Sequence, residues 1–540
     1  MLAALPATRK PGVRQWLHRT AERLAARGRH PTPAPPPAVP VAPAPPPPPV
    51  PLVRPNLSVL ARPEAVLPQF VQDCPVAQKY RHLLADLAWA QFPERPTNRP
   101  WPGPQPAPRA PFVAAYLVKL EEGKAHMADL RTYLVEHPAL VWLLGFPLVP
   151  SATAPWGFDV AASLPTAKHF GRVLRELPNA AAQFLLDGTV TALQVALPPE
   201  VNFGDIVAGD TKHIIAWVKE NNPKAYIKDR YDKTQQPAGD PDCKLGCKRR
   251  HTRGAAGPES TCAAAEAPAA PAAAAAPTTP TAAGTPARQA TVGEYYWGYA
   301  SGVIATKVAD WGEFVLAELT QTFDQPDVSY FFPLMAQVER RLGRKPRYGA
   351  LDMGFDAHYI YDYFHAAGGF AAIPLAERGD TSRQFDAQGL PLCPAGLAMP
   401  RKGVFTCHTS RFEQQRGRYA CPLRYPQPTG EPCPSADPHW AKGGCVVTMP
   451  TSTGARIRYQ LDRESAEFKA IYKQRTADER VNSQALELGI ERPKLRHGAA
   501  IANQNTLIYV LINLRALQRV RAHQAALARQ TAAATAPPSA

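Results

Sequence analysis

Three kinds of feature are scarce in this 540-residue sequence, and each scarcity narrows the class of protein. No apolar run approaches about eighteen residues, so a membrane-spanning helix is not expected. The nine cysteines show neither regular pairing nor a CxxC knuckle, which favours a reducing cytoplasm over a secreted disulfide scaffold. Acidic residues are the minority, because 45 aspartates and glutamates face 61 lysines and arginines, a formal charge of +16. This excess favours a polyanionic partner over an acidic small molecule.

Proline and alanine, by contrast, are abundant, and they mark segments that cannot form a core. Residues 31–51 contain 13 prolines in 21 positions, which predicts an extended linker within a disordered region over 1–69. The preceding segment, 1–30, lacks the apolar core and cleavage site of a targeting peptide, so we expect a basic arm. Residues 253–290 and the tail 521–540 are also predicted to be disordered.

The segment 70–200 is predicted to be an all-α domain, because its apolar residues recur at i, i+3 and i+4. Within it, 163–177 has the pattern of a helix capped by Thr166, with Lys168 and Arg172 following. This pattern fits the recognition helix of a helix-turn-helix, which would make the domain DNA-binding. It fits equally an ordinary amphipathic helix with solvated bases, and both interpretations stay open.

Two aspartates follow short apolar runs further along the chain. IVAGDTKHIIAW, residues 206–217, predicts a buried strand that ends at Asp210. In 348–364 a second run ends at Asp352, Gly354 breaks it, and an amphipathic helix follows. A strand holds a carboxylate rigidly while the adjoining loop leaves it open, so both aspartates are candidate catalytic residues.

A third carboxylate lies in YKQRTADER, which spans 472–480. The spacing of Tyr472, Arg475 and Glu479 places their side chains on one face of a helix. Arg475 can hold phosphate oxygens, Tyr472 can donate to one, and Glu479 can bind a divalent cation. The alternative is an exposed face with an i,i+4 ion pair. Together with the two aspartates, Glu479 supplies the oxygen ligands that two-metal phosphoryl transfer requires.

The order Asp210, Asp352, Glu479, with Tyr-x2-Arg-x3-Glu around the last, resembles the DDE transposases of bacterial insertion sequences, in the group with the Tyr-Arg-Glu signature. Other segments resemble that family in the same order: DPDCKLGCKRR (240–250), EYYWGYASGVI (294–304), LTQTFDQPDVSYFFPLM (319–335) and 492–517. The resemblance covers roughly residues 70–250 and 290–520. It departs from the signature at Leu486, where a lysine is usual, so a lysine contact to DNA at this position is not expected.

The resemblance implies a ribonuclease-H-like α/β domain over 201–520, a mixed sheet flanked by helices and preceded by the all-α domain. Its expected strands end at Asp210, span 295–307 and 313–321, end at Asp352, and span 370–376, with helices at 328–342 and 357–366. It further implies that Asp210, Asp352 and Glu479 bind two Mg²⁺ ions, for which Mn²⁺ can substitute, and that Tyr472 and Arg475 hold DNA. The partners would be transposon ends and target DNA, bound by at least a dimer at the cytoplasmic nucleoid.

Cysteines suggest a second kind of metal site. Five of them fall in a Gly- and Pro-rich insertion, 378–460: Cys393, Cys407, Cys421, Cys433 and Cys445. Structural zinc and simple buried thiols are the alternatives there. Cys243, Cys247 and His251 are another candidate set, in a basic segment where Lys244, Lys248, Arg249 and Arg250 instead favour phosphate contact.

Several residues compete for the same roles. Asp205 precedes the first apolar run, and Asp356 is expected in the first turn of the next helix, where it would complement the helix dipole. His213 can orient water or simply pack, and Glu487 and Glu491 are expected to be solvated. Two other functions also fit the pattern: a DNA-binding protein that retains the fold without cutting, and a nuclease without strand transfer.

Overall fold

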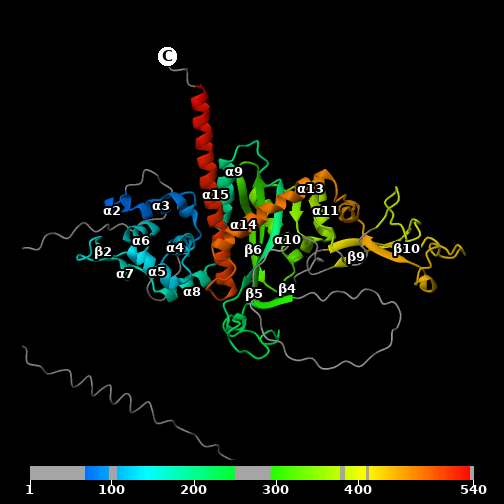
Figure 1. The fold of residues 1–540 in the computed structure, drawn as a ribbon, viewed down its shortest axis with the longest axis horizontal. Coiled ribbons are helices and arrows are strands. Elements are labelled where there is room, and N and C mark those ends of the chain that lie inside the picture. The colour runs from blue at the N-terminus through cyan, green and yellow to red at the C-terminus, as the bar shows by residue number, and fades with distance from the viewer. Residues whose placement is uncertain (1–66, 96–105, 250–292, 377–382, 409–412, 536–540) are drawn as a thin grey trace, which may run out of the picture. The chain divides into compact units, whose positions relative to one another are not determined.

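The computed structural model describes residues 67–95, 106–249, 293–376, 383–408 and 413–535 (Figure 1). The predicted basic arm and linker, up to residue 66, lie outside the described residues. So does the whole of the predicted disordered segment 253–290. No helix among the described residues is long and apolar enough to cross a membrane.

The first part of the described chain is helical, as its periodicity predicts. The elements are α2 (Gln69–Gln72), α3 (Pro75–Leu84), η2 (Trp89–Gln91), α4 (Arg109–Glu121), α5 (Met127–Glu136), α6 (Pro138–Leu144), β1 (Val149–Pro150), β2 (Phe158–Asp159), α7 (Val160–Ser163), α8 (Ala167–Glu176) and α9 (Asn179–Ala196). Thr166 caps α8 as predicted, because its hydroxyl accepts a hydrogen bond from the backbone N–H of His169 at 3.3 Å. Lys168 and Arg172 lie on the exposed side of this helix.

A six-stranded mixed sheet follows, which confirms the α/β class. Its strands are β3 (Ile206–Ile215), β4 (Lys244–Arg249), β5 (Gly293–Val308), β6 (Gly312–Thr322), β7 (Tyr348–Leu351) and β8 (Phe370–Ala372), with η3 (Lys219–Asn221) after β3. β5 is antiparallel to β3, β4 and β6, whereas β3, β7 and β8 are parallel. The parallel neighbours are reached through α10 (Phe331–Leu342) and α11 (His358–Ala366). The predicted strands and helices of this region are therefore present, although the first strand continues past Asp210 and the strand predicted over 370–376 ends at Ala372.

The two faces of the sheet belong to two hydrophobic clusters, and α9 and α15 contribute to both of them. On β5, Val303 and Ala305 belong to the hydrophobic cluster that includes α14, α15 and the N-terminal helices. Ala300 and Ile304 point to the other face and join the cluster that includes α10 and α11. Because side chains alternate along a strand, residue parity tells which face a side chain occupies.

The helices that complete the first face lie at the C-terminal end of the chain. They are α13 (Ala466–Tyr472), η7 (Lys473–Arg475), α14 (Thr476–Glu487) and α15 (Gly498–Thr535). α15 is the long helix coloured orange to red in Figure 1. It continues to Thr535, so the prediction of a disordered tail over 521–540 is wrong for 521–535.

A buried polar network joins three layers of the structure. Glu318 of β6 accepts hydrogen bonds from Thr506 of α15 at 2.7 Å and from Gln183 of α9 at 3.2 Å. Asn513 of α15 donates to the Thr189 hydroxyl of α9 at 3.0 Å. The N-terminal helices and the sheet thus share both apolar and polar interior contacts.

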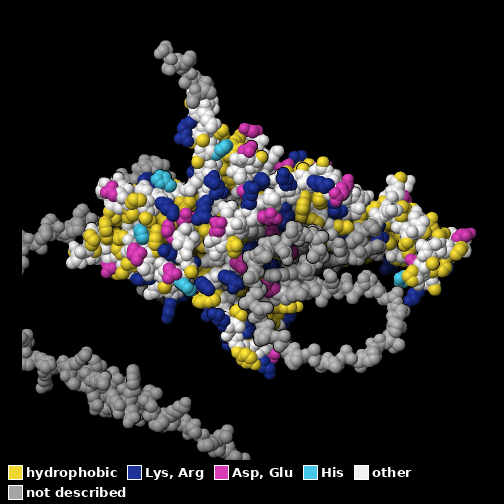
Figure 2. Space-filling model, in the orientation of Figure 1, with side chains coloured by type: hydrophobic (Ala, Val, Ile, Leu, Met, Phe, Trp, Pro, Cys, Tyr) yellow, Lys and Arg dark blue, Asp and Glu magenta, His cyan; other side chains and the backbone are white. Residues whose placement is uncertain are grey.

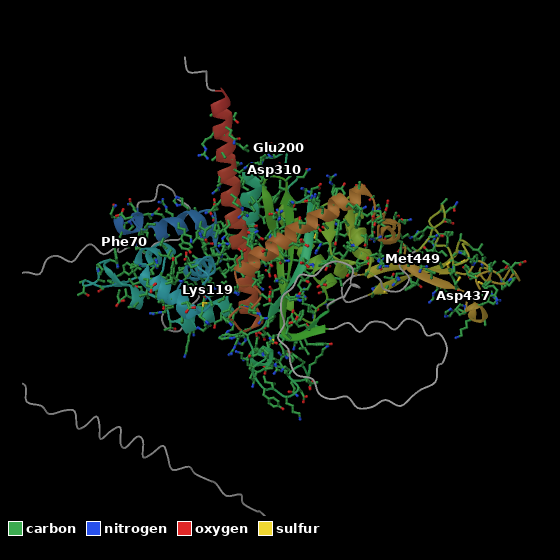
Figure 3. The ribbon with its side chains drawn as sticks, viewed as in Figure 1. Phe70, Lys119, Glu200, Asp310, Asp437 and Met449 are labelled. Carbon is green, nitrogen blue, oxygen red and sulfur yellow. The ribbon has the colours of Figure 1, made fainter. Side chains whose placement is uncertain are left out.

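The insertion contains its own small sheet of β9 (Arg401–His408), β10 (Glu413–Ala420) and β11 (Val446–Pro450), followed by α12 (Thr453–Gln460). It therefore has more regular structure than the loop-rich segment that the sequence predicts. Its fully buried apolar cluster consists of Met399, Tyr419 and Met449, the last of which is labelled in Figure 3.

Candidate active site

Asp210 lies in the middle of β3, so the prediction that this strand ends at Asp210 is wrong. The polar stretch after it continues the strand because its backbone pairs with β5 as far as Ile215 and Gly298. Asp210 has the parity of buried Ala208, which belongs to the cluster on the α14 face. Its carboxylate accepts from the backbone N–H of Thr211 at 2.8 Å and from the Asn482 side chain at 3.0 Å.

Asp352 follows β7 directly and lies beside Asp210. In the parallel ladder Gly209 pairs with Leu351, so the two aspartates come one residue later on neighbouring strands, which are about 4.8 Å apart. Asp352 shares the parity of Ala350, which is again on the α14 face. The sheet thus presents both carboxylates to the helix that carries Glu479.

The loop after Asp352 is shaped by crowded oxygens. The backbone N–H of Gly354 donates to Asp352 at 2.8 Å. A Cβ atom at Gly354 would come within 2.4 Å of an Asp327 oxygen and 2.9 Å of an Asp352 oxygen. Glycine is therefore required here, because a side chain would displace one of the two carboxylates.

Glu479 lies in the first turn of α14 and is bound by Arg475, whose guanidinium donates to it at 2.7 Å. Tyr472, Arg475 and Glu479 do not share one uninterrupted α-helix, because the tighter η7 turn separates α13 from α14. The Tyr472 ring stacks on Phe468 with 5.8 Å between centroids. The i,i+4 ion pair between Arg475 and Glu479, the alternative interpretation of this segment, is present near the two aspartates.

Burial and neighbouring carboxylates raise the pKa values of both aspartates. Burial raises the pKa of Asp210 to about 6, with Asp352 and Asp327 adding to the rise. Burial also raises the pKa of Asp352, helped by Asp327. Arg475 acts in the opposite direction on both aspartates. A divalent cation would relieve the same repulsion more strongly.

Asp327 is a site residue that sequence reasoning missed. It begins η4 (Asp327–Ser329) and accepts a hydrogen bond from the Thr211 hydroxyl at 2.7 Å. It stands in the quoted segment 319–335, but nothing local shows that this turn reaches β3 and the Asp352 loop. Only the fold reveals it as a fourth carboxylate.

Asp478 is a second missed residue. It is a fully buried residue of α14, next to Glu479 in sequence, and its two oxygens have no hydrogen-bond partner of normal geometry among the described residues. Burial, and then the charge of Asp210, raise its pKa well above its ordinary value. Burial and the nearby carboxylate of Asp210 thus disfavour the charged form of Asp478, which lies where α14 meets the sheet.

A cavity of about 480 Å³ opens beside Asp210 and Glu479. His213, Lys248 and Leu486 contribute to its lining. Burial lowers the pKa of His213, so its imidazole is neutral at pH 7. Glu491, predicted to be solvated, instead forms an ion pair with Lys212 at 3.4 Å at this cavity.

The site's donor set fits divalent metal ions that prefer oxygen. The Asn482 side-chain oxygen is buried and has no hydrogen-bond partner among the described residues, while its nitrogen donates to Asp210, so this amide oxygen lies next to the carboxylates. The oxygens of Asp210, Asp352 and Glu479 do not all lie within 4.8 Å of one another. A cation bound by Glu479 would compete with Arg475, which donates to this carboxylate in the structure.

The competing aspartates have structural partners. Asp205 accepts from Arg347 at 2.7 and 2.9 Å, just before β3 begins. Asp356 binds Arg458 through two hydrogen bonds, at 2.6 and 2.8 Å. The expectation that Asp356 complements a helix dipole is wrong, because it precedes α11 and its charge is matched by Arg458.

The first candidate cysteine set, Cys243 and Cys247, lies at β4. Cys243 precedes β4 and Cys247 lies within it, so four residues of strand, roughly 13 Å, separate them, and one ion cannot bind both. His251 and Arg250 lie outside the described residues. Lys248 lines the cavity, whereas Lys244 contacts the Gln236 side chain at 3.2 Å; Arg249 ends β4.

In the insertion, Cys421 and Cys445 lie at opposite positions, one step beyond the paired Ala420 and Val446. Burial, and then Cys421, raise the pKa of Cys445 to about 12, so this thiol stays protonated. No three of the described cysteine sulfurs lie within 4.8 Å of one another. Cys421 is buried, whereas Cys393, Cys407, Cys433 and Cys445 are half-buried, and both alternatives, structural zinc and simple thiols, stay predictions.

Comparison of the chain with protein-family models, with curated proteins and with solved structures gives no significant match.

Divalent-ion binding at Asp210 is expected to weaken as pH falls through about 6, because the carboxylate must lose its proton to bind metal. Affinity for Mn²⁺ should drop about tenfold per pH unit below that value. Calorimetric titrations between about pH 5 and 8, with Asp210→Asn subtracted as the control, isolate this site. A pH-independent difference between the two proteins would contradict the expectation.

Proposed function

We propose that this protein is a DDE transposase with a ribonuclease-H-like catalytic core, cutting DNA at transposon ends and joining it to target DNA. The observation that carries the proposal is the placement of Asp210 and Asp352 opposite each other, one residue beyond the paired Gly209 and Leu351 of two central parallel strands, on the face covered by α14. The resemblance of the sequence motifs to that family supports it independently.

In the proposed reaction, Asp210, Asp352 and Glu479 would hold two Mg²⁺ ions, whose charge would activate a water or a 3′-hydroxyl and stabilise the leaving oxygen. In the structure, Arg475 forms an ion pair with Glu479 at 2.7 Å. When Glu479 turns to the aspartates, the Arg475 guanidinium becomes available to hold a phosphate oxygen. Tyr472, three residues earlier, would help to fix the DNA strand. The protein's work is then positioning and charge neutralisation.

Basic groups around the cavity support a DNA substrate. Lys248 lines the cavity beside Asp210, and a neighbouring cavity of about 460 Å³ is lined by Trp217, Lys494 and Arg496. The Arg496 guanidinium lies 5.0 Å from the centre of the Trp217 ring. Figure 2 shows Lys and Arg side chains spread across the region that Figure 1 labels α14 and α15. Such groups can bind phosphates regardless of sequence.

The test is incubation of the purified protein with labelled duplex DNA that carries the repeats flanking its gene, with Mg²⁺ or Mn²⁺ and with EDTA. We expect metal-dependent cleavage at the repeat ends and joining of the freed 3′-ends to a second duplex. Binding without cleavage would favour the alternative, a DNA-binding protein that retains the fold. Cleavage without joining would favour a nuclease, and absence of binding would overturn the proposal.

A further inference from the structure

We propose a second, structural cation site, formed by Asp240, Asp242 and His497, which takes one divalent transition-metal ion such as Zn²⁺ or Mn²⁺. One ligand atom from each residue lies within 4.8 Å of the other two. This cluster does not overlap the Asp210 site, and it does not depend on the proposed function.

Asp240 supplies the observation that points to a ligand. Its side chain has no exposed surface, and one oxygen accepts from the Tyr299 hydroxyl at 2.8 Å. The other oxygen is buried and has no hydrogen-bond partner within the described part of the chain. A buried carboxylate oxygen without a donor is costly, and a bound cation would satisfy it.

The other two ligands face each other at a separation that suits one ion. His497 Nδ1 and Asp242 Oδ2 are 3.7 Å apart, too far for a hydrogen bond. Two ligands of one tetrahedral ion, each about 2.1 Å from it, are separated by about 3.4 Å. Asp242 is held in place by the backbone N–H of Gly498, which donates to it at 2.9 Å. His497 adopts φ 72°, a left-handed conformation that a β-branched residue would not tolerate.

The ligand chemistry selects the ion. Two carboxylates and an imidazole suit Zn²⁺ or Mn²⁺, whereas Mg²⁺ prefers oxygen ligands alone. The site joins the segment before β4 to His497, the residue that precedes α15, and Tyr299 of β5 connects it to the sheet. A bound ion would therefore fix the start of α15 against the sheet.

The experiment uses full-length protein with Asp210, Asp352 and Glu479 all replaced by alanine, so that ions at the catalytic site do not contribute. Co²⁺ serves as the probe, since its visible spectrum reports oxygen and nitrogen ligation and thiolate ligands add strong near-ultraviolet bands. We expect one tightly bound Co²⁺ without thiolate bands, and a rise in melting temperature when it binds.

Adding Asp242→Asn or His497→Ala should each abolish this ion and the rise in melting temperature. Asp232→Asn is the matched control and should retain both, because Asp232 is a half-buried carboxylate of the same segment that accepts hydrogen bonds from Thr234 and Gln235 of its own turn. Circular dichroism of the metal-free variants establishes that they are folded. The proposal would be overturned by any of three results. These are no tightly bound Co²⁺ in the triple-alanine parent, thiolate bands in its spectrum, or Co²⁺ binding by the Asp242→Asn and His497→Ala proteins equal to that of the parent.

Discussion

Replacing Asp352 by alanine is expected to lower metal-dependent DNA cleavage by about 1,000-fold or more, equivalent to about 4 kcal/mol of transition-state stabilisation. The reason is that Asp352 lies opposite Asp210 on the neighbouring strand, so its loss removes one of the three carboxylates that would hold the ions. Cleavage rates at saturating Mg²⁺ measure the effect. Asp324→Ala, an exposed carboxylate three residues before Asp327, is the matched control and should stay near the parent rate.

The same variant separates chemistry from folding. Because burial and Asp327 raise the pKa of Asp352 above 3.8, the folded protein loses stability as pH rises from that value through the folded-state pKa. Removing the carboxylate therefore should not lower the melting temperature of the metal-free protein at pH 7, and it should reduce the stabilisation that Mg²⁺ provides. An inactive variant that melts well below the parent would attribute the lost activity to misfolding instead.

Replacing Arg458 by alanine is expected to lower the free energy of unfolding by about 3–5 kcal/mol, the usual cost of leaving one partner of a buried ion pair alone. The side chains of Arg458 and Asp356 are only 9% and 1% exposed. Asp356 also accepts from the Tyr361 hydroxyl at 3.0 Å and from the backbone N–H of Ala376 at 2.9 Å. Loss of the guanidinium would leave a charged carboxylate in an apolar interior.

Urea unfolding of the metal-free protein measures this loss. Arg480→Ala is the matched control, because Arg480 also pairs with a carboxylate, that of Glu313, but is 61% exposed. Its removal should cost about 1 kcal/mol or less. Equal losses in the two variants would contradict the role assigned to burial. Pairing Arg458→Met with Asp356→Leu should recover part of the loss, since no unpaired charge would then remain.

Local patterns predicted much of the fold but little of the site's interior. Apolar runs located β5, β6 and α10, and the Thr166 cap was visible because the hydroxyl and the N–H that it binds are three residues apart. The end of β3 was missed because polar residues there are paired by β5, more than eighty residues away. Local sequence cannot show such a partner.

Local sequence likewise predicted some residues of the candidate site and missed others. Asp210, Asp352 and Glu479 could be named from strand and helix patterns. Asp327 and Asp478 could not, because their importance depends on which turn reaches β3 and which side of α14 meets the sheet. The ion pair that explains Asp356 spans about a hundred residues, across an insertion with its own sheet.

The interior contacts among α9, β6 and α15 limit how the DNA-sequence specificity of such a protein could change. Without the N-terminal helices, Glu318 would lose Gln183, and the apolar side of α15 that meets α9 would be uncovered. The helices that would recognise DNA are therefore not an interchangeable cassette. A change of target sequence, in evolution or in engineering, would proceed more easily through exposed residues of α8 such as Lys168 and Arg172, which alter the surface and leave the shared interior intact.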